Sequence, residues 1–198
     1  DYTGEFDPEL RLEDFDRSAL EVALGEFALQ SHLLLRAFLL SVTNRCGADR
    51  AAAILPRLVA GWCSLTAQRI RDALSLEPTP EGLATMLSLH PMFSPRTYVD
   101  AAVAVDGESV RLTFRDCPAA RENDDLTWFS GLGGPTDDVL SQVVAAFHPQ
   151  ARLVPAVAND GEAYAYEATI DPGREPAAEP PELAIAKIST GATFRFRT

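Results

Sequence analysis

Apolar residues recur at steps of three and four over residues 16–46, and this spacing predicts one long α-helix. Seven positions share one face of that helix: Leu20, Leu24, Phe27, Ser31, Leu34, Phe38 and Val42. Asp16 is a residue type that caps helix starts, and Gly47 is the type that follows helix ends. Between His32 and Val42 almost every face is apolar. We therefore expect other elements to enclose this half of the helix, and the core of the protein to form around it.

Three more helices are predicted behind the first. Residues 48–55 form a short one capped by Asp49, which Pro56 ends because proline lacks a backbone donor. Residues 56–74 form a second long helix, and the short connection makes it an antiparallel hairpin with the first. Thr79 followed by Pro80 starts a third helix, which ends at His90. The first half of the chain is therefore helical.

The pattern then changes to alternation. Residues 98–105 and 109–115 read as strands joined by Asp106 and Gly107, a pair typical of hairpin turns. In the second strand one set of side chains should be covered and the other wet; the covered set is Val110, Leu112 and Phe114, and the wet set is Arg111, Thr113 and Arg115. A helix over 137–147, capped by Thr136, precedes a second hairpin of residues 151–158 and 162–170. Edge strands are expected at 184–188 and 193–197.

This order of segments predicts an α+β fold, with an N-terminal helical hairpin packed on a mostly antiparallel sheet. Residues 1–14 are expected to be an extended acidic arm, and residues 15–198 a single domain with a helical half at 15–90 and a sheet half at 97–198. The polar, glycine-bearing segment 118–134 is expected to be a long loop, either a lid or a disordered excursion. The Pro- and Ala-rich segment 172–181 is expected to be a stiff linker.

Charge and cysteine content restrict the partners. A net charge of −12 argues against binding of nucleic acid or of an anionic membrane surface. The apolar run 33–42 is interrupted by Arg36 and is too short to span a bilayer. Cys46, Cys63 and Cys117 are few and far apart, as in a reducing compartment. We therefore expect a cytoplasmic protein.

Candidate chemistry centres on Cys117, which lies beside Arg115 and shortly before Arg121. Positive neighbours favour the thiolate, so Cys117 could act as a nucleophile if His32, His90 or His148 lies near it; the alternative is that Cys117 and His32 are structural. His90 and His148 follow predicted helices, where capping explains them. The histidines have no metal-binding spacing, and the chain has no phosphate loop or serine-nucleophile motif. We therefore predict no metal and no cofactor.

A few residues carry a resemblance to a known family. The order of Leu12-Glu13-Asp14-Phe15 before a long helix, Cys46-Gly47, a helix bearing Trp62, and Arg115-Asp116-Cys117-Pro118 closing a strand resembles a bacterial family related to L-2-amino-thiazoline-4-carboxylate hydrolase-like domains. The likeness covers most of residues 12–171 and implies a helical hairpin on an antiparallel sheet, with several cysteines near the sheet end. Of those cysteines this chain has Cys117 alone, and residues 148–159 contain none.

Two functions from different classes follow. The first is a binding or accessory domain, in which a cavity between hairpin and sheet holds a small apolar or amphipathic ligand, or in which the same surface is closed by a partner subunit or by a second copy in a homodimer. The expected lining of that cavity is His32, Phe38, Trp62, Phe114 and Trp128. The second is a hydrolase of the cyclic-amide type, with Cys117 as nucleophile, His32 as base and Arg115 or Arg121 holding a substrate carboxylate.

Overall fold

The computed structural model describes residues 7–121, 126–134 and 136–178. The elements in chain order are η1 (Leu12–Asp14), α1 (Arg17–Cys46), α2 (Ala48–Leu74), α3 (Pro80–Leu89), η2 (Pro91–Phe93), β1 (Ala101–Asp106), β2 (Ser109–Arg115), α4 (Pro118–Arg121), η3 (Trp128–Gly131), α5 (Thr136–Phe147), β3 (Ala151–Ala156) and β4 (Glu162–Ile170). The strands form one antiparallel sheet in the order β1-β2-β4-β3. The α+β prediction is confirmed. The strands expected at 184–188 and 193–197 lie outside the described residues.

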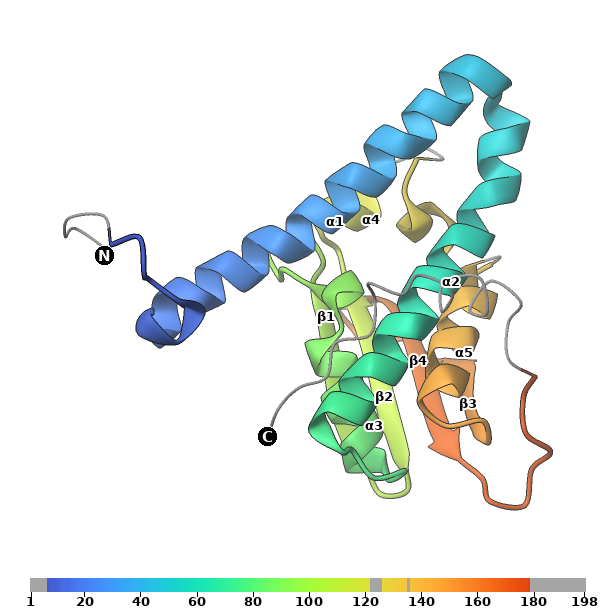
Figure 1. Ribbon diagram of the computed structural model, residues 1–198. Helices are drawn as coiled ribbons and strands as arrows, with labels where there is room; N and C mark the ends of the chain where they lie inside the picture. The colour runs from blue at the N-terminus through green and yellow to red at the C-terminus, as the bar shows by residue number, and fades with distance from the viewer. Residues whose placement is uncertain (1–6, 122–125, 135, 179–198) are drawn as a thin grey trace.

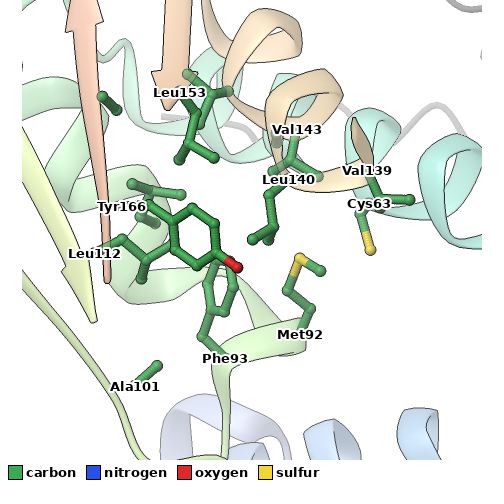
Figure 2. Close-up of a cluster of buried hydrophobic side chains, with 14 of the residues drawn as sticks. Cys63, Met92, Phe93, Ala101, Leu112, Val139, Leu140, Val143, Leu153 and Tyr166 are labelled. Carbon is green, nitrogen blue, oxygen red and sulfur yellow. The ribbon is translucent and has the colours of Figure 1, made fainter. Parts of the chain in front are cut away.

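The core lies between one face of the sheet and the helices α2, α3 and α5 (Figure 1). From the sheet, alternate residues of β2 and β4 point into it, including Leu112 and Tyr166, which are register partners. Figure 2 shows these two side chains beside Leu140 of α5 and Met92 of η2. The helices therefore close the apolar face of the sheet completely along its centre.

The ends of α1 are as the sequence predicts, but its surroundings are not. The Asp16 carboxylate accepts a hydrogen bond from the Ala19 N–H, and Gly47 follows the last turn with φ +91°. Only Ala28, His32 and Leu39 are buried in this helix, because α1 packs mainly against α2 and η2. The expectation that α1 is the enclosed centre of the core is wrong for the single chain, since α3 and α5 cover the sheet and α2 packs on these two helices.

α2 is one continuous helix, which corrects the predicted break at Pro56. Proline in a helix removes one hydrogen bond and costs about 3 kcal/mol. The helix continues because residues on both sides of the proline are packed: Ala51 is buried before it, and Val59 and Cys63 are buried in the core after it. Ala52, whose carbonyl loses its donor, is exposed, so water can bond that carbonyl. Asp49 lies in the first turn rather than at the cap, which is Gly47.

The two hairpins form as predicted, with small shifts. Asp106 pairs with Ser109, so the two-residue turn consists of Gly107, at φ +58°, and Glu108. β1 starts at Ala101 instead of residue 98. Thr113, expected to be wet, is buried, because its register partners on both sides are alanines whose strands flank it closely.

The 118–134 segment is not one long loop in the residues that can be described. It contains α4 and η3, and within η3 the side chains of Trp128 and Phe129 are buried. Residues 122–125 lie outside the described part. The second half of this segment therefore contributes to the core and is not a lid.

Candidate functional site

The most unusual surface of the molecule is the one between α1 and α2. These helices form a V, and the N-terminal half of α1 extends beyond the rest of the fold (Figure 1). Between them lies a groove of about 380 Å³, which we call the α1–α2 groove; it is lined by Ser31, Leu34, Leu35, Phe38, Leu58, Val59 and Trp62. Its only hydroxyl, on Ser31, already donates to the Phe27 carbonyl at 3.0 Å. The groove therefore offers an almost purely apolar surface.

The apolar face of α1 continues from the groove along the projecting half. We call this face the α1 seam, and it consists of Leu20, Leu24, Phe27, Ser31, Leu34 and Phe38. Leu24 and Phe27 are each 68% exposed, Leu34 is 73% exposed and Phe38 is 46% exposed. Their spacing alternates four and three residues, which is the repeat by which helices pair in coiled coils. The residues predicted to face the core thus lie on the outside.

Of the residues expected to line a ligand cavity, Phe38 and Trp62 do line the groove. Phe114 and Trp128 do not, because they are packed inside an aromatic cluster. The ring centroids of Phe114 lie 6.5 Å from Trp128, 6.4 Å from Phe129 and 6.1 Å from Tyr166, all in edge-to-face arrangements. The expected cavity between hairpin and sheet is therefore filled at these two positions.

His32 is buried at the junction of α1 with the body. Its Nε2 lies 3.0 Å from the Ser94 carbonyl, which can only accept, so Nε2 carries the proton. The imidazole packs at ring-centroid distances of 5.2 Å from Tyr98 and 5.9 Å from Phe129. This arrangement is that of a hydrogen-bonded structural histidine that fixes α1 to the body.

His90, expected only to cap a helix, is more deeply placed. Its Nε2 donates to the Cys63 carbonyl at 3.0 Å, and its Nδ1 accepts from the Met92 N–H at 3.2 Å. Burial lowers the pKa of His90 from 6.5 to about 4; the bond to Cys63 opposes this shift, and nearby His32 adds to it. A neutral imidazole thus links α2 to η2 inside the core.

The groups proposed for hydrolysis are differently placed. Cys117 is only 3% exposed, and it does not line the α1–α2 groove. Arg121 is exposed and donates two hydrogen bonds to Asp116, at 2.9 and 2.6 Å, which lower the pKa of Asp116. Arg115 is also exposed. Of the two guanidinium groups expected to hold a substrate carboxylate, that of Arg121 therefore already binds a carboxylate of the protein.

Two polar features were missed by sequence reasoning. The Tyr166 hydroxyl donates to Asp137 at 2.7 Å and accepts from the Gly133 N–H at 3.2 Å, which forms a partly buried link between β4 and α5. Burial raises the pKa of Tyr166. A cleft of about 410 Å³ contains the side chains of Arg71, Arg152 and Arg174. These partners lie far apart in sequence, so no spacing signals them.

Two further properties of the described residues concern metal binding and membrane insertion. No group of three or more His, Cys, Asp or Glu side chains within them is placed to hold a metal ion. By length and composition α1 is the one described helix apolar enough to cross a membrane, a property that core helices and signal sequences share. Only 17% of the most apolar 18-residue stretch of α1 is buried.

Comparisons with known proteins add no assignment. No family model matches the chain, and neither the curated proteins nor the solved structures contain a match. The resemblance to L-2-amino-thiazoline-4-carboxylate hydrolase-like domains therefore stays a prediction, as do the cytoplasmic location and the absence of nucleic-acid and membrane partners. The assignment of function depends on the geometry alone.

Proposed function

We propose that this chain is an oligomerisation or accessory domain whose α1–α2 surface is covered by another protein subunit. One observation carries the proposal: large apolar side chains are exposed along the α1 seam and on the facing side of α2, namely Leu24, Phe27, Leu34, Phe38 and Leu58. Single exposed apolar residues are ordinary on soluble proteins, but a contiguous set of this kind is typical of interaction sites.

The size of the surface fits a protein partner. A helix of 30 residues is about 45 Å long and about 10 Å wide, so one face offers on the order of 450 Å². The walls of the groove enlarge it toward the roughly 800 Å² per partner of a standard interface. Leu24, Phe27, Leu34, Phe38 and Leu58 are exposed on or beside the seam. Two copies would bury ten such side chains, each half exposed and contributing about 1 kcal/mol, against an association cost of about 4–15 kcal/mol.

The other candidate functions fit this surface less well. Small-ligand sites combine an apolar wall with a few polar groups that orient the ligand, and the groove has almost none free for that purpose. A hydrolase needs a reachable nucleophile, whereas Cys117 is buried and Arg121 is bound to Asp116. A bilayer-spanning role for α1 would place Arg36 in its apolar middle. Each of these features favours a protein partner.

The experiment measures the mass of the purified full chain by light scattering over a range of concentrations. The wild type should associate, and Leu24→Glu should shift the association to much higher concentration, because an unpaired carboxylate would be buried in the interface. Val22→Glu is the matched control: Val22 is 68% exposed like Leu24, but it lies on the opposite side of α1. Circular dichroism should show that both variants keep their helices.

Two outcomes would contradict the proposal. One is a wild type that remains monomeric at the highest concentration reached. The other is equal weakening by Leu24→Glu and Val22→Glu, which would separate association from the seam. Flotation with liposomes of neutral phospholipid tests the membrane role: wild-type protein that floats while Leu24→Glu does not would assign the surface to lipid.

A further inference from the structure

We infer that the partner is a second copy of this chain. The two copies pack antiparallel about a two-fold axis beside Ser31, so that the projecting half of α1, residues 17–31, of each copy lies along the α1–α2 groove of the other. This inference rests on the proposed function and adds to it the identity and the direction of the partner. It joins two features that the single chain leaves incomplete. The projecting half of α1 carries the exposed Leu24 and Phe27, and the α1–α2 groove offers the apolar walls, with Leu34 and Phe38, into which such side chains fit.

The seam is nearly symmetric about Ser31. Leu24 lies seven residues before Ser31, and Phe38 lies seven residues after it. Phe27 and Leu34 lie four before and three after, so each apolar position of one half has a counterpart in the other half. An antiparallel second copy would therefore set Leu24 against the partner's Phe38 and Phe27 against the partner's Leu34. This is the self-complementary arrangement that a two-fold interface requires.

Ser31 suits the crossing point. It is the smallest side chain of the seam, its hydroxyl is bonded within its own helix at 3.0 Å, and it lines the groove. A small residue lets two helix backbones approach closely where they cross, as small residues do at other helix interfaces. Larger side chains on either side then fill the partner's groove. The arrangement buries the projecting half of α1 and the groove at the same time, and it does so twice per dimer.

Charge distribution favours the antiparallel direction. Residues 7–31 contain seven carboxylates and two arginines, whereas residues 32–58 contain four arginines and one aspartate. Antiparallel pairing places the acidic residues 7–31 of each copy near the basic residues 32–58 of the other copy. Parallel pairing would place the two acidic segments together and the two basic segments together. The charge distribution therefore selects the antiparallel direction, and the near-symmetric apolar spacing about Ser31 is compatible with it.

Disulfide trapping tests the geometry. In a Cys46→Ser background, which removes the exposed native thiol, Leu24→Cys and Phe38→Cys are made separately and are also co-expressed. In the antiparallel pair, residue 24 faces the partner's residue 38, while the two copies of residue 24 lie about 21 Å apart along the axis. A disulfide needs Cα atoms within about 7 Å. Mild oxidation should therefore cross-link the co-expressed pair and neither variant alone.

The outcomes separate this inference from the proposed function. Rapid cross-linking of Leu24→Cys alone would show a parallel pair, and it would overturn the inference while the domain remained an oligomerisation domain. The inference would also be overturned if the associated species contained more than two chains. It would be overturned too if light scattering showed association but no combination of the cysteine variants cross-linked. If the Cys46→Ser protein is monomeric, both this inference and the proposed function are overturned. Phe38→Glu and Leu40→Glu form a matched pair, because Phe38 is 46% exposed on the α1 seam and Leu40 is 47% exposed on the opposite side of α1. Phe38→Glu should raise the dissociation constant of the dimer at least a hundredfold more than Leu40→Glu.

Discussion

The buried imidazole of His90 should make the protein sensitive to mild acid. In the folded protein both ring nitrogens are used, Nε2 by the Cys63 carbonyl and Nδ1 by the Met92 N–H. A second proton would have to displace the Met92 bond, and it would bring an unpaired charge into the core. Burial, which disfavours the charged imidazolium, is the main reason that the folded-state pKa of His90 is about 4 rather than 6.5.

The sign and the size follow from proton linkage. Because the folded-state pKa lies below the unfolded value, the unfolded chain binds the proton first as the pH falls. The contribution of His90 to stability is therefore complete above pH 6.5 and is lost as the pH falls from 6.5 towards about 4. Across that difference, at 1.36 kcal/mol per pH unit, the loss amounts to about 3 kcal/mol. This is a large part of the roughly 5–15 kcal/mol that holds a domain folded.

The perturbation is His90→Gln. The glutamine amide can still donate to the Cys63 carbonyl but has no charge to gain. Urea unfolding followed by circular dichroism gives the free energy of unfolding at pH steps between about 7 and about 4.5, the window set by the two pKa values. The protein concentration must be held constant, because association would couple to unfolding. Over this window the wild type should lose about 2.5 kcal/mol more than the variant.

The variant is expected to be less stable than the wild type at neutral pH, since it loses the imidazole packing against Phe93 and Trp62. The diagnostic quantity is therefore the difference in slope, not in absolute stability. Ser88→Gln, at an exposed position two residues earlier, should keep the wild-type slope. Parallel curves for wild type and His90→Gln would refute the reasoning, because they would mean that His90 takes up its proton equally in both states.

Two other changes test the packing and the reactivity. Gly82→Ala should destabilise the fold by about 1–3 kcal/mol, because a methyl group there would overlap the Glu77 carbonyl oxygen; urea unfolding measures this, and an unchanged midpoint would contradict it. With Ellman's reagent the native protein should show one fast thiol, Cys46, while Cys63, whose pKa burial raises, and Cys117 should react only on unfolding. A second fast thiol that Cys117→Ala removes would restore the nucleophile hypothesis.

Features of the fold that depend on neighbouring residues could be predicted from the sequence. The Asp16 and Thr79 caps and the stop at Gly47 formed as expected, because a cap needs only the N–H groups two or three residues away. The 3–4 spacing of α1 correctly predicted one long helix, and it identified the face that we call the α1 seam. It did not determine what covers that face, since core helices and paired helices share the same pattern.

Features that depend on distant partners could not be predicted. The continuation of α2 through Pro56 depends on packing of its two halves, which overrides a local rule. The link between His90 and the Cys63 carbonyl spans 27 residues and has no sequence signal. Arg121 is the exception: Asp116 lies only five residues before it, so this carboxylate is a local partner that the sequence itself offers to the guanidinium.

The position of α2 also has a consequence for biosynthesis. Val59, Cys63 and Ala67 of this helix are buried against elements that end at Ile170, about a hundred residues later in the chain. At translation rates of about 5–20 residues per second, these side chains wait roughly 5–20 s for their partners. During that time these apolar side chains of the nascent hairpin are uncovered, and a chain in this state is prone to aggregate.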